Sequence, residues 1–316
     1  MMAASGTRNI VIVGAGPAGL STALSLAEGG VTPLLFDATA DRLRVPVDLP
    51  EPICRAFDER VARAGAAIAF RRASVFHAEP GAVWIHAEGK AERIPFGILV
   101  LATGPVPALA PAKTGDWAEI GQLPDNRLAA ALGCDHAFDS QLRWLLPVRD
   151  NDMAASIPGV YLPGAGLLDD AIAEGVRVAA AILGRPAEDL PTKSHPPAWS
   201  WPAWSWPVDV ALPDDAVICA CNAVTVAALR RAITSGARTL HHLGQYGGAG
   251  AGHCRGRICQ VALAHALVEE TGLALADVLT PPAEFPAVTL PLSVFADIML
   301  ERPPASAPAL DKGALW

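Results

Sequence analysis

Long apolar runs are missing from this 316-residue sequence, although 52% of its residues are hydrophobic and its mean hydropathy is +0.32. No uninterrupted apolar stretch reaches the roughly 18 residues that a membrane-spanning helix needs. The apolar N-terminal region is interrupted by glycine and proline, and it lacks the basic segment and cleavage site of a signal peptide. We therefore predict a cytoplasmic protein without a membrane span.

Clusters of basic residues are also missing. The chain has 24 Lys and Arg against 32 Asp and Glu, which gives a formal net charge of −8. Nucleic-acid binding needs grouped positive charge, so we expect no nucleic-acid partner. The sequence contains no Ser/His/Asp set and no paired carboxylates in a hydrolase motif, and we therefore assign no catalytic acid, base or nucleophile.

The first motif that is present is a glycine-rich turn between a predicted strand at 9–13 and a predicted helix that ends near Glu28. A second predicted strand at 32–36 follows, and Asp37 ends it, 18 residues after the last glycine of the motif. This order is that of a Rossmann-like α/β unit, in which the glycines allow a tight turn, approach of a pyrophosphate and close helix packing. Asp37 is placed to bind a ribose hydroxyl. The predicted nucleotide-binding residues of this turn are Gly14, Gly16, Pro17, Ala18 and Gly19.

Three later features extend this unit. Strand and turn signals alternate from Ser74 to Lys90 and a third apolar run follows, which predicts a three-stranded β-meander. A buried strand then ends in Ala102-Thr103-Gly104. A strand at 157–163 runs into Gly164-Ala165-Gly166, before a predicted helix at 168–183. In this order the features resemble the two-dinucleotide-binding, glutathione-reductase-like flavoproteins. The resemblance implies FAD along the first unit, with the Ala-Thr-Gly turn and the two late glycines as further cofactor-binding residues.

The sequence departs from that family in two places. The family has an acidic residue where this chain has Ala165, so one hydrogen bond to the flavin chain would be missing. Only 54 residues separate Gly104 from Gly159, and they contain no second glycine motif. We therefore expect that the NAD domain is deleted between about 105 and 127. An ADP- or ATP-type nucleotide remains the alternative to FAD.

A proline-rich stretch at 186–213 predicts a linker between a nucleotide-binding domain at 1–185 and a C-terminal domain with its tail at 214–316. Within the linker, Pro-Ala-Trp-Ser-Trp occurs twice in succession, at 197–201 and 202–206. Four indoles offer a large apolar area, so we expect them to pack on this chain or on a partner subunit.

The most specific signal is a set of four cysteines in the pattern CxC, 32 residues, Cx4C. They are Cys219, Cys221, Cys254 and Cys259. A helix at 226–234 with Thr225 as its N-cap and a glycine-rich loop at 244–252 lie between the two pairs, and such loops direct amides toward sulfur. Four thiolates suit a [2Fe-2S] cluster or zinc. The tight CxC with a distant second pair is similar to small, α-rich bacterioferritin-associated ferredoxin-like domains, which implies [2Fe-2S].

The whole combination resembles the larger FAD subunit of opine oxidases and related subunits of hydroxyproline dehydrogenase and hydrogen cyanide synthase. The segments 128–135 and 147–150 and the Pro-rich tail at 281–286 also fit that group. The resemblance implies an oxidoreductase subunit that relays electrons from a partner dehydrogenase subunit, and a further possible partner is a small ferredoxin-like subunit. The alternatives are an iron-delivery protein and a non-catalytic scaffold subunit.

The remaining cysteines and several histidines receive structural interpretations. Cys54 on a predicted helix at 51–64 and Cys134 in an apolar stretch are expected to pack in the core. His241, His242 and His253 flank the glycine-rich loop, and one of them could replace a cysteine as a cluster ligand. Four available cysteines make that replacement unnecessary.

Overall fold

The core of the N-terminal half is a five-stranded parallel sheet in the order β12-β7-β1-β2-β3. The computed structural model describes residues 9–39, 43, 49–111, 117–140, 142–164, 168–186, 213–254, 256, 258–279 and 290–301. The strands are β1 (Ile10–Val13), β2 (Leu34–Asp37), β3 (Ala69–Arg72), β7 (Ile98–Leu101) and β12 (Val160–Tyr161). Helix α1 (Pro17–Glu28) connects β1 to its parallel neighbour β2, which confirms the predicted Rossmann-like order.

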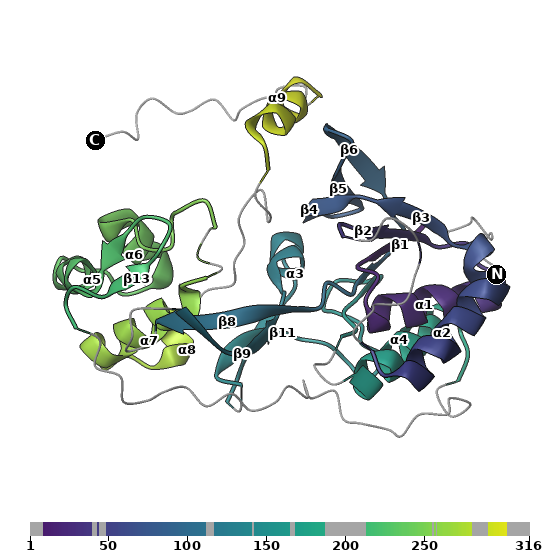
Figure 1. Ribbon diagram of the computed structural model, residues 1–316, viewed down its shortest axis with the longest axis horizontal. Coiled ribbons are helices and arrows are strands. Elements are labelled where there is room, and N and C mark those ends of the chain that lie inside the picture. The colour runs from purple at the N-terminus through teal and green to yellow at the C-terminus, as the bar shows by residue number, and fades with distance from the viewer. Residues whose placement is uncertain are drawn as a thin grey trace.

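Both faces of this sheet are covered by other elements. Side chains of a strand alternate between the two faces, so each strand contributes to a buried cluster on either side. Ile10 and Ile12 of β1 join one buried cluster, and Val11 and Val13 join another. Helices cover the first face, as Figure 1 shows. They are α1, α2 (Glu51–Ala64) and α4 (Leu168–Leu183), with a short 3-10 turn, η1 (Gly65–Ala67), after α2.

The predicted meander is confirmed and helps to cover the second face. It is an antiparallel sheet of β4 (Ser74–Glu79), β5 (Ala82–Ala87) and β6 (Lys90–Pro95). Helix α3 (Arg127–Leu132) covers the same face through Leu128 and Leu132. The meander's outer side carries α9 (Leu292–Glu301), whose Val294 and Ile298 bury Phe76 and Trp84. The tail of the chain thus returns to the N-terminal half.

Two hairpins occupy the segment between β7 and β12. They are β8 (Pro105–Pro111) with β9 (Trp117–Pro124), and β10 (His136–Asp139) with β11 (Trp144–Pro147). Each forms a two-stranded antiparallel sheet of its own. Figure 1 shows them extending from the parallel sheet toward the C-terminal domain. The deletion of an NAD domain from this segment stays a prediction.

The C-terminal domain is small and mostly helical, as expected. Its elements are β13 (Val217–Cys219), β14 (Val224–Thr225), α5 (Val226–Thr234), α6 (Leu240–Gly247), α7 (Gln260–Thr271) and α8 (Leu275–Val278). Helix α5 begins where predicted, because the Thr225 Oγ1 accepts a hydrogen bond of 3.3 Å from the Ala228 amide. The predicted fold class, a Rossmann-like domain with a meander plus a small α-rich domain, is confirmed.

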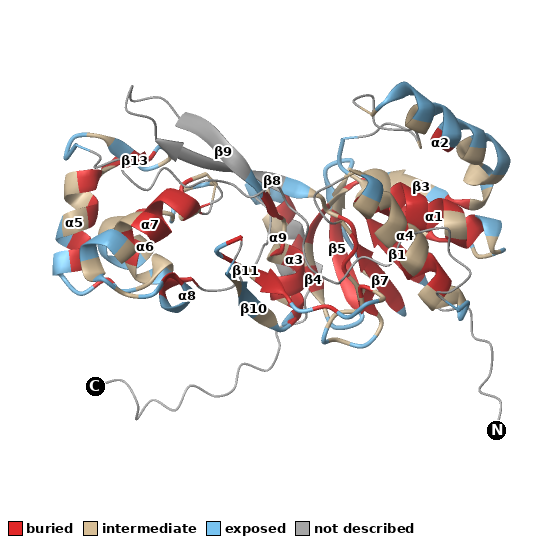
Figure 2. Cartoon of the chain, turned by 90° about the horizontal axis from the view of Figure 1, so that it is seen from below, coloured by how far each residue is buried: buried red, intermediate tan, exposed pale blue. Residues whose placement is uncertain are grey.

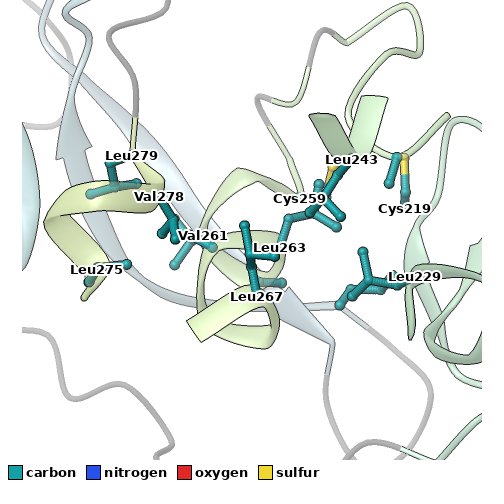
Figure 3. Close-up of a cluster of buried hydrophobic side chains, with 14 of the residues drawn as sticks. Cys219, Leu229, Leu243, Cys259, Val261, Leu263, Leu267, Leu275, Val278 and Leu279 are labelled. Atoms are coloured by element: carbon teal, nitrogen blue, oxygen red, sulfur yellow. The ribbon is translucent and has the colours of Figure 1, made fainter. Parts of the chain in front are cut away.

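One hydrophobic core joins the hairpins to the C-terminal domain. Leu123 of β9 and Trp144 and Leu146 of β11 belong to the same buried cluster as Ile218 and Leu263. Figure 2 shows buried residues on β11 and on these helices, and Figure 3 shows the helical side of the cluster. The two halves of the molecule are therefore packed together through the hairpins.

The Trp-rich repeat lies outside the described residues, so its predicted packing stays a prediction, and the Pro-rich tail segment at 281–286 also lies outside them. The same holds for the domain boundaries at 186–213. Within the described part of the chain, every helix is too short or too polar to cross a membrane.

Candidate functional site

The glycine-rich turn packs tightly at two of its glycines and leaves space at the third. A Cβ added to Gly14, whose φ is +101°, would lie 2.2 Å from the Ala102 carbonyl oxygen, and one added to Gly19 would lie 1.9 Å from the Gly14 oxygen. A Cβ on Gly16 would meet nothing within 4 Å. The turn is thus held against the Ala-Thr-Gly strand end, with open space in front of Gly16.

This turn fits a bound phosphate. Gly16 is the N-cap of helix α1 and has no side chain that could accept from the first amides of the helix. Such amides, together with the helix dipole, bind anions. Ala18, Ala102 and Ala171 form one buried cluster, which brings the turn, the end of β7 and α4 together. The residues present therefore suit the diphosphate of FAD or of another nucleotide.

Asp37 lies beside the turn, where the spacing places it. Its Oδ2 accepts a hydrogen bond of 2.8 Å from the Ala15 amide, and its Oδ1 accepts one of 2.8 Å from the Thr39 amide. The Thr39 hydroxyl also donates to Oδ1 at 2.8 Å, so the Asp37 carboxylate holds the turn to the end of β2. Its role in ribose binding stays a prediction.

A small pocket joins the Ala-Thr-Gly turn to the late glycine motif, which are 60 residues apart in the sequence. Pro124 and Pro147, the last residues of β9 and β11, also line it. The lining residues are Leu101, Thr103, Gly104, Pro124, Asp125, Asn126, Ala129, Pro147, Leu162, Pro163 and Gly164. Three predicted residues, Thr103, Gly104 and Gly164, therefore meet at one site. Gly166 and Ala165 lie outside the described residues.

Sequence reasoning missed one wall of this pocket. The Asp125 backbone carbonyl accepts a hydrogen bond from the Thr103 hydroxyl at 3.0 Å, and its carboxylate binds the Arg127 guanidinium at 2.6 Å. The buried Asn126 donates to the Leu145 carbonyl at 3.0 Å. These residues follow the β8–β9 hairpin, and no motif marks them in the sequence.

Arg149, Glu174 and Gly175 were also not assigned. Arg149 and Glu174 form a buried ion pair at 2.8 Å next to the pocket, and the Glu174 carboxylate accepts from the Gly164 amide at 2.7 Å. Gly175 lets α4 cross α1, since a Cβ there would lie 2.2 Å from the Ala18 oxygen. The isolated glycine within a predicted helix was the available signal for this close approach.

The four predicted cysteine ligands come together in pairs. The Cys259 and Cys219 thiols are in hydrogen-bond contact, and so are those of Cys221 and Cys254. Cys219 and Cys259 are buried, whereas the second pair is partly exposed. Among the described residues, no three His, Cys, Asp or Glu side chains gather closely enough for a single metal ion. The two pairs lie close enough to act on each other electrostatically, Cys219 on Cys221 and Cys254 on Cys259. Four neighbouring thiols of this kind suit a [2Fe-2S] cluster, which takes two protein ligands on each iron.

The loop around these thiols brings its backbone close to the sulfur atoms. The Gly250 amide donates to the Cys219 Sγ at 3.4 Å, as the glycine-rich sequence predicts. A Cβ on Gly252 would lie 2.4 Å from the Cys221 Cβ, so only glycine fits there. One expectation was wrong: 244–247 is not loop but the end of α6, since these residues continue the turn capped by Thr239. The loop begins at Gly248.

The pKa values of two of these thiols, Cys221 and Cys259, are raised. The hydrogen bond from Cys254 raises the pKa of the Cys221 thiol. Burial, followed by the charge of Cys219, raises the pKa of the Cys259 thiol more strongly. The positive charge of a bound metal would convert such thiols to thiolates.

The other cysteines and the histidines have the structural positions that were expected or lie at the edge of the site. Cys134 is buried, and burial followed by the charge of Asp135 raises its pKa to about 11, so it is a poor nucleophile. Cys54 donates to the Leu49 carbonyl at 3.3 Å. His253 lies 3.7 Å from the Cys221 Sγ, whereas His242 packs on Tyr246 of α6.

Comparison with protein-family models identifies two regions. Residues 8–124 match the pyridine nucleotide-disulphide oxidoreductase family, and residues 217–269 match the BFD-like [2Fe-2S] binding domain. The first region contains the glycine turn and the Ala-Thr-Gly turn, and the second contains all four cysteines. These matches support both predicted cofactors, FAD and [2Fe-2S].

Curated relatives point the same way. The chain is 26% identical over 200 residues to the opine oxidase A subunits of Rhizobium meliloti and of Agrobacterium tumefaciens strain Ach5. Each alignment covers 56% of this chain but only 38% and 40% of the two relatives, so the chain matches well under half of their length.

Among solved structures, L-proline dehydrogenase from P. horikoshii is similar in fold, with a TM-score of 0.66 over 91% of this chain and 79% of the other, at 16% identity. The fold, the two family matches and the curated relatives agree. The chain is thus related to opine oxidase A subunits and combines a pyridine nucleotide-disulphide oxidoreductase region with a BFD-like [2Fe-2S] binding domain.

Proposed function

We propose that this chain is the electron-transfer subunit of a hetero-oligomeric amino-acid or opine dehydrogenase. In this proposal FAD lies between the glycine turn and the pocket at Gly164, and a [2Fe-2S] cluster is held by the four cysteines. A partner subunit oxidises the substrate and passes its electrons to this chain. Support for a partner comes from the relatives, each of which is named as one subunit of an opine oxidase.

The observation that carries the proposal is the continuity between the two sites. Leu123 and Leu146 lie in the core that surrounds Cys219 and Cys259. The next residue in each strand, Pro124 and Pro147, lines the pocket that contains Gly164. The hairpins therefore connect the candidate flavin pocket and the cysteine domain within one packed body, as an internal electron relay requires.

The pocket itself favours relay over substrate oxidation. When bound, a flavin accepts two electrons together and releases them singly, and a cluster takes them one at a time. Asp125 is the one residue lining the described pocket with an ionisable side chain, and Arg127 holds it. Because Arg127 already binds the Asp125 carboxylate, that carboxylate is not available to take a proton from an amine substrate. We therefore assign proton removal to the partner subunit.

The test is to purify the protein without oxygen and to measure its visible spectrum, iron, sulfide, zinc and flavin on one sample. About one FAD and two irons with two sulfides per chain support the relay. Iron without flavin would favour the scaffold or iron-delivery alternatives. Zinc without sulfide would reject the cluster, and bound ADP or ATP would reject FAD.

A reduction experiment then tests the direction of electron flow. Photoreduced FAD on the chain should reduce the cluster within the same molecule, so the rate should not depend on protein concentration. A Cys219→Ser variant should keep FAD and lose that second step. Cluster reduction that rises in proportion to protein concentration would contradict an internal relay.

A further inference from the structure

A buried ion pair lies directly behind the pocket. The Arg149 guanidinium binds both carboxylate oxygens of Glu174, with Nη1 to Oε2 at 2.9 Å and Nη2 to Oε1 at 2.8 Å. The side chains are only 1% and 12% exposed. Replacing a buried ion pair with apolar residues is often neutral or stabilising. Stability alone is therefore a weak reason for this pair.

Both members of the pair reach the strand end that lines the pocket. Arg149 Nη1 donates to the Leu162 carbonyl at 2.8 Å, and Glu174 Oε2 accepts from the Gly164 amide at 2.7 Å. Leu162 and Gly164 both line the pocket. Gly164 has a φ of +128°, in the region that favours glycine. Ordering a glycine costs more conformational entropy than ordering any other residue, so a hydrogen-bond partner stabilises this backbone. The pair supplies one on each side of Pro163.

Glu174 is also connected, through its neighbour Gly175, to the end of the site where the phosphate would bind. Glu174 is followed by Gly175, whose Cα approaches the Ala18 oxygen so closely that a Cβ would lie 2.2 Å away. The Thr22 hydroxyl also donates to the Gly175 carbonyl at 3.1 Å. Helix α4 is thus fixed to α1 at Gly175 and to the pocket at Glu174. Any shift of α4 would change the span between the glycine turn and Gly164.

We propose that Arg149 and Glu174 are positioning residues for the flavin. They hold the backbone at 162–164 at a set distance from the glycine turn, so that one extended ligand meets both. The carboxylate that orders this turn comes from helix α4 and not from the glycine motif itself. The inference rests on the proposed function, since it concerns the FAD site.

The test is the double variant Arg149→Met with Glu174→Leu, which removes both backbone contacts while keeping apolar volume. The matched control is Arg60→Met with Glu28→Leu. That pair is also bidentate, at 2.9 and 2.8 Å, and it joins α2 to the far end of α1 without lining the pocket. The probes are FAD itself, titrated by quenching of its fluorescence, and amide hydrogen exchange of the peptide that contains Gly164.

In the double variant we expect Gly164 to exchange about tenfold faster in flavin-free protein and FAD to bind about ten- to hundredfold more weakly, the scale of a lost charge-assisted hydrogen bond. The cluster's visible circular dichroism should not change. Arg149→Lys keeps the charge and loses the bidentate contact, so its FAD affinity should fall between wild type and double variant. This milder variant also serves as the test if the double variant does not fold.

Several results would overturn the inference. Unchanged FAD affinity in both variants would reject positioning, whether or not Gly164 exchange increases. An equal loss in the Arg60/Glu28 control would show a general effect of destabilisation. Wild-type protein that binds no FAD would overturn the flavin part of the proposed function, and this inference with it. Wild-type binding with unaffected variants would overturn the inference alone.

Discussion

Backbone forms the candidate flavin site, whereas side-chain sulfur forms the candidate cluster site. At the glycine turn the groups that would face a phosphate are main-chain amides and the open space at Gly16. In the C-terminal domain the groups that would hold iron are four thiols, two of them fully buried. The same chain thus binds one cofactor by shape and the other by coordination.

This difference predicts how each site tolerates change. A site made of many weak backbone contacts can lose one partner, such as an acidic residue at 165, and keep part of its affinity. A cluster with four ligands loses a whole coordination bond when one thiol is removed. The cysteine region should therefore respond to single substitutions in an all-or-none manner and the nucleotide region gradually.

The largest expected effect is from Cys259→Ser. Cys259 is 1% exposed, contacts Cys219 and starts helix α7 in the shared core. We expect iron to fall from about two atoms per chain to nearly none, and the C-terminal domain to lose its cooperative unfolding, since metal binding and folding are coupled. Iron and sulfide assays with circular dichroism measure this.

The matched control for that variant is Cys134→Ala. Cys134 is also buried, at 5% exposed, but it lies against the parallel sheet, in a different core. This substitution should reduce stability slightly and leave the iron content unchanged. Full iron content in Cys259→Ser would remove this residue from the ligand set.

The next effect concerns the core that joins the two regions. Trp144 is 6% exposed and packs in the cluster that contains the buried cysteines. Trp144→Ala should lower the free energy of unfolding by about 3–5 kcal/mol. In this variant the cluster absorption should also be lost at a different denaturant concentration from the one that unfolds the parallel sheet. A denaturant titration followed by two spectroscopic signals measures both transitions.

Trp84→Ala provides the comparison, because Trp84 is also buried but packs on α9 and the meander. Trp84→Ala should lower the free energy of unfolding by a similar amount, and the loss should appear in the transition of the N-terminal half. Coincident transitions for both signals in Trp144→Ala would mean that the two regions are not separable in this way.

The same contrast explains what the sequence could predict. Helices at 51–64, 168–183 and 226–234 follow from apolar spacing and caps, and they occur at those residues. The cysteine set follows from spacing, because few other functions require four thiols in CxC and Cx4C. Local signals and side-chain chemistry were sufficient for these features.

The features that could not be predicted depend on contacts between distant segments. Glu174 looks like any acidic residue on a helix until α4 is packed and its carboxylate meets the Gly164 amide. The shared core needs Trp144 and Cys259 in one cluster, although 114 residues separate them in the sequence. The return of α9 to the meander depends on Phe76 and Trp84 being left uncovered by nearer elements.

A smaller effect on the free energy of unfolding is expected from pH, through a buried histidine of the C-terminal domain. His265 of α7 is 6% exposed, and burial followed by the charge of Arg143 lowers its pKa from 6.5 to about 4. The unfolded chain binds a proton near pH 6.5 and the folded chain does not, so stability is full above that pH and falls between pH 6.5 and 4. At pH 5 the loss is about 2 kcal/mol.

Urea unfolding of wild type and His265→Gln at pH 7 and pH 5 measures this contribution. The difference between the two proteins should shrink at pH 5, because only the wild type contains the histidine that takes up a proton on unfolding. A difference that is the same at both pH values would show that His265 titrates normally in the folded chain.

The smallest effect distinguishes two glycines of the same turn. Gly16 has a φ of −69° and open space around its Cα, so Gly16→Ala should leave the melting temperature nearly unchanged. The new methyl group would stand where a phosphate approaches the backbone, and we expect FAD affinity to fall about tenfold, or about 1.4 kcal/mol. Fluorescence titration and calorimetry measure the two quantities.

Gly19→Ala should give the opposite pattern, since its Cβ would lie 1.9 Å from the Gly14 oxygen and the helix must move. Its melting temperature should therefore fall, and FAD affinity should fall as a consequence. Neither variant should alter the iron content, because the buried cluster ligands Cys219 and Cys259 belong to the shared core, whereas the glycine turn packs in the parallel-sheet half. A Gly16→Ala protein with unchanged FAD affinity would place the phosphate elsewhere, and the backbone-made site would lose its main support.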